Sequence, residues 1–131
     1  MLSVQDNEAL ARVGKGTPGG ELMRRYWHPI AATAELDDRP TKAVRLLGED
    51  LALYKNQSGT YGLIDRLCPH RRVDLTYGIP EDDGLRCMYH GWMFDVAGHC
   101  VDIPNVAAAE NIQRKIRITA YPTREAGGVV W

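Results

Sequence analysis

The sequence predicts a mainly β fold, a sandwich or barrel of short antiparallel strands preceded by a short helical segment. The first observation behind this prediction is that short apolar runs recur from residue 42 onward, with turn-forming residues between them. The second is that this pattern starts only after His28 and Pro29, which places the helical part before it. At 131 residues with 44% apolar content, the chain is long enough to form one domain with its own core.

The segment before the strands predicts two short helices. Asp6 can cap a helix that runs to Val13. Thr17 and Pro18 place a capping side chain and a proline at the start of a second helix, which we expect to reach Trp27.

The remainder of the chain predicts strands joined by turns. The predicted strands cover residues 42–47, 51–55, 61–65, 85–87, 92–95, 100–103 and 115–120. Residues 56–59 and 96–99 are turns, residues 77–84 form an acidic connector, and Pro104 with Asn105 ends a strand. Residues 127–131 are another apolar β run, so we expect this sequence to be cut from a longer one inside or just after its last strand.

Two cysteine–histidine pairs lie within the predicted β region. One residue separates Cys68 from His70, and two residues separate Cys87 from His90. Two thiolates and two imidazoles are the ligand set of a Rieske [2Fe–2S] centre, in which one iron takes two cysteines and the other takes two histidines. The pairs therefore predict such a cluster as cofactor and one-electron transfer as its chemistry. The predicted cluster-binding loops cover residues 66–73 and 86–95.

Zinc is the alternative occupant of these four side chains, because a set of two sulfurs and two nitrogens suits Zn²⁺ as well as iron–sulfur clusters. Common zinc modules, however, place paired cysteines before paired histidines and space the histidines more widely. The alternating order of this sequence therefore favours the cluster.

Several residues beside the predicted ligands are expected to support the site. Gly91 lets the backbone approach the cluster without a Cβ. Arg71 and Arg72 could stabilise the charge of a reduced cluster or orient a partner, but one of them could instead pair with the acidic residues at 81–83. Trp92 is expected to pack beneath the second loop, where its indole N–H would need a partner if it is buried.

The composition excludes several classes of function. The net charge is −1, and no basic stripe suggests a nucleic-acid surface. No apolar run reaches the roughly 18 residues of a membrane span, and residues 1–10 lack the apolar core of a signal peptide. Cys100 is left without a partner once the other two cysteines are ligands, which fits a reducing cytoplasm.

The segments around both pairs resemble the Rieske domain of ring-hydroxylating oxygenase large subunits of the phthalate 4,5-dioxygenase type. The similar segments are residues 17–29, 67–71, 89–95, 103–104 and 127–131. This resemblance implies a Rieske-type β-sandwich over residues 29–131, with residues 1–28 as a helical lead-in. It also implies that Cys68 and Cys87 bind the inner iron, whereas His70 and His90 bind the outer iron.

The same resemblance implies an oxidoreductase. The domain would pass electrons from an NAD(P)H-dependent flavin and iron–sulfur reductase to a mononuclear iron. The full-length protein would be a homo-oligomer, a trimer, that hydroxylates or demethylates an aromatic substrate. The C-terminal domain that holds this second iron is absent from the sequence. Respiratory Rieske proteins have an extra cysteine in each loop and a serine after the second His-Gly. Because these are missing here, we expect a potential at the low end of roughly −150 to +300 mV. The rival hypothesis is a stand-alone Rieske-type ferredoxin.

Overall fold

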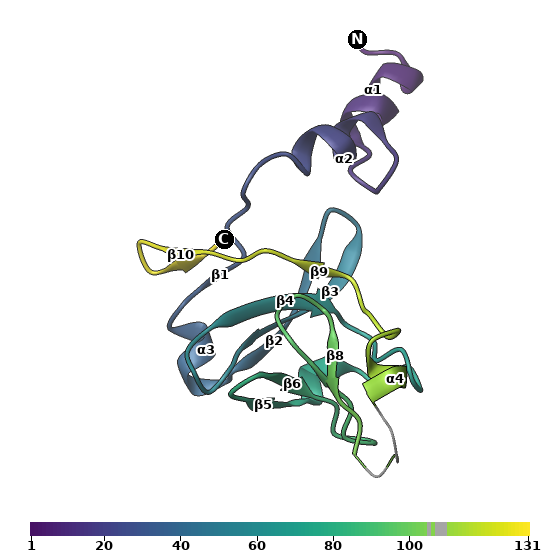
Figure 1. Ribbon diagram of the computed structural model, residues 1–131. Coiled ribbons are helices and arrows are strands. Elements are labelled where there is room, and N and C mark those ends of the chain that lie inside the picture. Colours follow the sequence, from purple (N-terminus) through teal and green to yellow (C-terminus); the bar gives the residue numbers. More distant parts are fainter. Residues whose placement is uncertain (105, 107–109) are drawn as a thin grey trace.

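The computed structural model describes residues 1–104, 106 and 110–131, and the strands in this part form three antiparallel sheets (Figure 1). The central sheet has the order β2 (Thr41–Leu46), β3 (Glu49–Lys55), β4 (Tyr61–Asp65) and β9 (Ala120–Tyr121). The second sheet has the order β5 (Ile79–Glu81), β6 (Gly84–Arg86), β7 (Met93–Phe94) and β8 (Cys100–Asp102). The third has the order β1 (Ala31–Ala32), β11 (Val129–Val130) and β10 (Glu125–Ala126).

The helical elements of the described residues are short and lie at the ends of the chain or between strands. They are α1 (Val4–Ala11), α2 (Pro18–Met23), α3 (Glu35–Asp38), the 3₁₀ turn η1 (Leu75–Tyr77) and α4 (Glu110–Gln113). The predicted fold class, a mainly β sandwich of short antiparallel strands, is confirmed.

Strand β3 is buried on both faces, so its sheet is the middle layer of the sandwich. Ala52 and Tyr54 pack into the core that lies toward the second sheet. Leu51 and Leu53 pack into a core with side chains of α3, β1 and β11. Because successive strand side chains point to opposite faces, one uninterrupted apolar run serves both cores. The two predicted cysteine ligands belong to the first of these cores.

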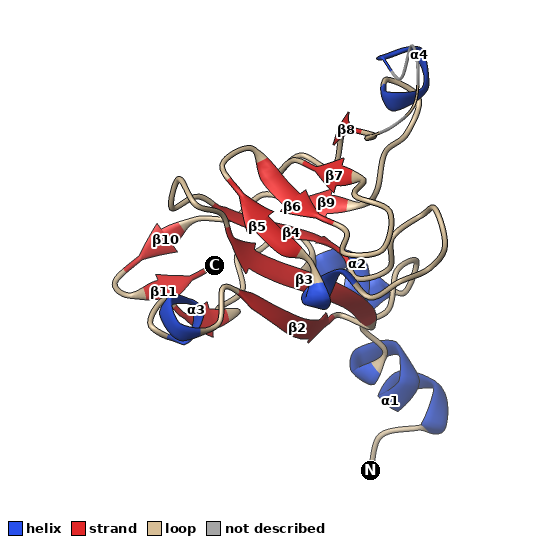
Figure 2. Cartoon of the chain, turned by 90° about the horizontal axis from the view of Figure 1, so that it is seen from below, coloured by secondary structure: helices blue, strands red, loops and turns tan. Residues whose placement is uncertain are grey.

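The N-terminal helices differ from their predicted bounds. Helix α1 is capped by the Ser3 side chain, which accepts the Asp6 N–H, so Asp6 is in the first turn rather than at the cap. None of its residues is buried, and it projects away from the β layers (Figure 1, Figure 2). Thr17 caps α2 as predicted, but α2 ends at Met23 instead of reaching Trp27.

The later part of the chain also corrects some predictions. The acidic connector begins at the last residue of η1 and contains the whole of β5, because its residues 79–81 pair with β6. The strand predicted at 115–120 is reduced to a single bridge between His99 and Arg117, followed by β9. Helices α3 and α4 were not predicted. The break predicted at Asn105 lies outside the described residues.

Candidate metal centre

The first predicted loop follows β4 and closes on Cys68. The Cys68 N–H donates to the Val73 carbonyl at 2.9 Å, and the Arg72 N–H donates to the Cys68 carbonyl at 2.9 Å. Arg72 has a left-handed backbone, with a φ of 60°. The turn between these bonds contains His70, so the backbone itself brings the first predicted cysteine and histidine close together.

The second predicted loop connects β6 to β7 and has the same hydrogen-bond pattern. The Cys87 N–H donates to the Trp92 carbonyl at 2.8 Å, and the Gly91 N–H donates to the Cys87 carbonyl at 3.0 Å. Gly91 has a φ of 75°. A Cβ at this position would lie 2.6 Å from Pro104 Cγ, so both the backbone angle and the space require glycine.

The two cysteines meet in the core between the sheets. Cys68 is 2% exposed and Cys87 is 3% exposed, and both belong to the same core cluster. Burial raises the pKa of Cys68 to about 11, although backbone N–H groups of His70 and Arg71 that point at the sulfur act in the opposite direction. A thiol with a raised pKa is a poor nucleophile at neutral pH, whereas a bound metal ion deprotonates it outright.

The two histidines lie together closer to solvent. The ring centroids of His70 and His90 are 4.6 Å apart, with an angle of 60° between the ring planes. His70 is half-buried and His90 is exposed. Partial burial, with the nearby charges of His90 and Arg71, lowers the pKa of His70, which favours the neutral imidazole that metals bind.

The four side chains thus form a buried cysteine pair and a histidine pair nearer the surface. Among the described residues, no three His, Cys, Asp or Glu side chains are grouped as they would be around one ion. The structure therefore brings the predicted ligands together as two pairs, Cys68 with Cys87 and His70 with His90, and their joint binding of one cluster stays a prediction.

Trp92 packs against the core that contains Cys87 of its own loop. Its ring also stacks on His70, with the centroids 4.5 Å apart and the planes 2° from parallel. It therefore covers a histidine of the first loop, a contact that was not predicted. The Tyr89 ring lies 3.8 Å from that of His90, so each histidine has an aromatic neighbour from the second loop.

Among the described residues, the acidic connector pairs with neither Arg71 nor Arg72, so that alternative for these two arginines is not seen. Glu81 binds Arg86, with Nε to Oε1 at 2.5 Å and Nη2 to Oε2 at 2.9 Å, and not Arg71 or Arg72. Both of those arginines are exposed. Arg86 is a site residue that the sequence analysis missed; the signal available was an arginine directly before a predicted cysteine ligand, five residues after a glutamate.

Asp74 anchors the first loop through a pair with Arg66. Asp74 receives Arg66 Nε at 2.8 Å on one carboxylate oxygen, and the Thr76 N–H at 2.9 Å on the other. Burial alone would raise the pKa of Asp74, but the hydrogen bonds from Arg66 and Thr76 outweigh it and hold the pKa below its ordinary value. The carboxylate thereby ties the strand before the loop to η1 after it.

The remaining histidines, His28 and His99, and the remaining cysteine, Cys100, lie outside the two ligand pairs. His28 Nε2 is 2.9 Å from the Met23 carbonyl oxygen, and His99 Nδ1 is 3.0 Å from an Asp95 carboxylate oxygen. Cys100 is a buried core residue, as predicted.

The longest helix in the described part of the chain, α1, has 8 residues, and no helix in that part could span a membrane.

Comparison with known proteins agrees with this geometry. The chain is 57% identical to the 5,5'-dehydrodivanillate O-demethylase oxygenase subunit of Sphingobium sp., with 100% of this chain and 32% of that protein covered. It is 46% identical to the phthalate 4,5-dioxygenase oxygenase subunit of Pseudomonas putida, with 100% and 30% covered. The predicted resemblance to the phthalate 4,5-dioxygenase type is thus confirmed, and the chain spans about a third of the length of these relatives.

Solved structures and a family model lead to the same assignment. The fold is similar to that of NdmA from Pseudomonas putida, with a TM-score of 0.73 and 30% identity over 85% of this chain and 34% of that one. It is also similar to dicamba monooxygenase, with a TM-score of 0.71 and 30% identity over 82% of this chain and 33% of that one. The model of the Rieske [2Fe-2S] domain matches residues 26–122. The chain belongs to the Rieske [2Fe–2S] domain family.

Proposed function

We propose that the chain is the electron-transfer part of a Rieske non-haem iron oxygenase. It would hold a [2Fe–2S] cluster through Cys68 and Cys87 on one iron and His70 and His90 on the other. The observation that carries this proposal is the separation of the four side chains into a buried sulfur pair and a nitrogen pair nearer solvent. That is the division of ligands a Rieske cluster needs, and a single tetrahedral zinc ion would not require it.

The chain's own residues fit this cofactor in three respects. The buried core around Cys68 and Cys87 excludes water from the sulfur side. The N–H groups of His70 and Arg71 point at the Cys68 sulfur, where they would stabilise negative charge. Trp92 holds the plane of the His70 ring by stacking on it. When bound, the cluster would supply reversible storage of one electron.

We infer that the whole protein is longer and contains the oxygen-activating half. Relatives about three times as long include a demethylase and a dioxygenase, which supports an enzyme that hydroxylates or demethylates an aromatic substrate. On this proposal, residues 1–28 are a lead-in, residues 29–131 are the Rieske domain, and a following domain holds a mononuclear iron. The donor would be an NAD(P)H-dependent flavin and iron–sulfur reductase, and the protein a cytoplasmic homotrimer.

Electron counting and oxygen consumption test this function. The chain alone should accept one electron per cluster from dithionite and consume no oxygen with substrate. Its native, longer polypeptide should consume oxygen in a substrate-dependent way when the reductase and NAD(P)H are supplied, and Cys68→Ser in that polypeptide should abolish this consumption. A native protein that only shuttles electrons between other proteins would contradict the oxygenase and support the ferredoxin hypothesis.

A further inference from the structure

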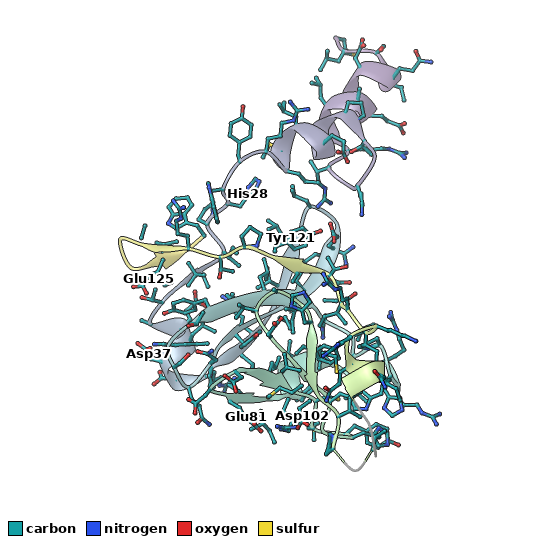
Figure 3. All side chains as sticks on the ribbon, in the orientation of Figure 1. His28, Asp37, Glu81, Asp102, Tyr121 and Glu125 are labelled. Carbon is teal, nitrogen blue, oxygen red and sulfur yellow. The ribbon has the colours of Figure 1, made fainter. Side chains whose placement is uncertain are left out.

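Arg86 joins the second loop to the strands on either side of it. Its Nη1 donates to the Gly91 carbonyl at 2.6 Å and to an Asp102 carboxylate oxygen at 2.6 Å. Its Nε and Nη2 donate to the two carboxylate oxygens of Glu81. The Arg86 side chain is 23% exposed, so these bonds form in a partly water-excluded environment. Figure 3 labels Glu81 and Asp102, which flank this position on the second sheet.

The register of the second sheet explains why these groups meet. Arg86 lies opposite Met93 on β7, and Met93 lies opposite Asp102 on β8, so the three side chains form a row on one face. On the other side Arg86 lies opposite Ile79, and Glu81 is two residues further along β5, hence on the same face. The guanidinium can therefore bridge two carboxylates and still reach the loop.

The loop carbonyl that Arg86 holds is at the turning point of the loop. Gly91 has the left-handed backbone, and it stands between His90 and Trp92. Fixing its carbonyl limits the rotation of the peptide that connects the exposed histidine to the tryptophan that covers His70. The matching position of the first loop is Arg72, and none of the hydrogen bonds among the described residues has its carbonyl as acceptor.

The charges of this group do not cancel. One guanidinium faces two carboxylates, which leaves a net charge of −1 beside the second loop. Because reduction adds an electron to a bound cluster, negative charge nearby makes reduction harder and positive charge makes it easier.

We propose that Arg86 is a positioning residue that fixes the second loop through the Gly91 carbonyl, and that Arg86 with Glu81 and Asp102 sets the charge that a bound cluster experiences. The charge part rests on the proposed function. The positioning part concerns the loop alone and can be tested without a cluster.

Hydrogen exchange of four matched amides in the metal-free chain tests the positioning role. In Arg86→Met, the N–H groups of Cys87 and Gly91 should exchange about tenfold faster or more, as expected from losing a charge-assisted hydrogen bond to the loop. The equivalent N–H groups of the first loop, at Cys68 and Arg72, should keep their rates. Wild-type rates at Cys87 and Gly91, or equal acceleration in both loops, would overturn the positioning role.

The reduction potential of the cluster-loaded chain tests the charge. Arg86→Met leaves two unpaired carboxylates, so its potential should fall. The triple variant Glu81→Gln, Arg86→Met, Asp102→Asn leaves no charge, so its potential should rise above wild type although its loop amides exchange as fast as those of Arg86→Met. Potentials that shift in the same direction in both variants would overturn the charge assignment.

Two further controls keep the test decisive. If Arg86→Met does not fold, Arg86→Lys retains the charge but lacks the planar fork, so its Cys87 and Gly91 amides should still exchange faster while its potential stays near wild type. Wild-type rates in that variant would overturn the positioning role. If the wild-type chain binds no cluster, the proposed function fails, and the exchange rates of the metal-free chain still decide the role of Arg86.

Discussion

The two loops have one backbone pattern but place their histidines differently within it. In each loop the cysteine N–H donates to the carbonyl five residues later, and its carbonyl accepts the N–H four residues later. Counted from the cysteine, His70 is the third residue in the first loop, whereas His90 is the fourth in the second. The spacings C-x-H and C-x-x-H therefore place the histidine at two different positions within the same hydrogen-bonded loop, and the loops themselves have the same length.

The loops also differ at the left-handed position and in their anchors. Arg72 occupies that position in the first loop and Gly91 in the second, where Pro104 leaves no space for a Cβ. A carboxylate, Asp74, anchors the first loop, and a guanidinium, Arg86, anchors the second. The shared frame thus tolerates different local chemistry, provided that each loop has its own anchor.

The largest expected effect comes from the four proposed ligands. Cys68→Ser, Cys87→Ser, His70→Ala and His90→Ala should each abolish or nearly abolish cluster binding, because each iron would lose one of its two protein ligands. Visible absorbance and iron content per folded chain measure this loss. Cys100→Ser is the control and should keep the cluster, since Cys100 is not one of the four proposed ligands and its thiol donates to the Asp102 carbonyl at 3.6 Å. A full cluster in any of the four variants would remove that residue from the ligand set.

The second-largest effect is expected from substitutions at the two left-handed positions, Gly91 and Arg72, which should change the stability of the chain in opposite directions. Gly91→Ala should destabilise the folded chain by about 2 kcal/mol or more, because an L-residue is strained at this φ and its Cβ would collide with Pro104. Arg72→Gly removes such strain and should stabilise the chain by about 1 kcal/mol or less. Urea unfolding measures both changes. Equal effects of the same sign would contradict the difference between the loops.

Acid should weaken the first loop through Asp74. Because its pKa is lowered in the folded chain, the folded state binds fewer protons than the unfolded state, so this stabilisation is present above about pH 4 and is lost as pH falls through the folded-state pKa. Asp74→Asn should cost about 1–3 kcal/mol at pH 7 and flatten the loss of stability in acid.

Urea unfolding between pH 2 and 7 measures this effect. Asp50→Asn is a suitable control because Asp50 pairs with Arg45 on the surface, where both side chains are mostly exposed. It should change stability little at any pH. An unchanged acid slope in Asp74→Asn would show that this carboxylate does not anchor the loop.

The smallest effect is expected from the stack between Trp92 and His70. Trp92→Leu should shorten the lifetime of the cluster in the presence of a chelator by about two- to tenfold, which corresponds to the 0.5–1.5 kcal/mol of an aromatic pair. Trp92→Phe, which keeps an aromatic face, should lose less. Trp27→Leu is the matched control, since Trp27 belongs to the lead-in, where its ring lies against Arg124. The same lifetime in Trp92→Leu and wild type would exclude the stack as a support of His70.

Sequence reasoning predicted the parts of the fold that local pattern determines. The strands β2, β3 and β4 are long enough to show apolar runs between turn residues, and the ligand pairs lie in short motifs. Strands of two residues that were not predicted, such as β1 and β10, cannot show an alternation, because their partners in the sheet define them.

The contacts of individual side chains were harder to predict because they depend on the register of the paired strands and on how the two loops approach each other. That Trp92 covers His70 follows from how the loops approach each other, which no local pattern contains. The role of Arg86 follows from its place opposite Met93 and Ile79 in the sheet. Glu81 was one of three acidic residues that were considered as partners for Arg71 or Arg72, but the pairing of β5 with β6 brings it to Arg86.

The most direct test of the central proposal is the metal and sulfide content of the chain purified without oxygen. A Rieske cluster held by the two cysteines and two histidines predicts two iron atoms and two acid-labile sulfides per chain. One zinc ion per chain with no sulfide would contradict this account, because all four side chains would then bind a single redox-inactive ion.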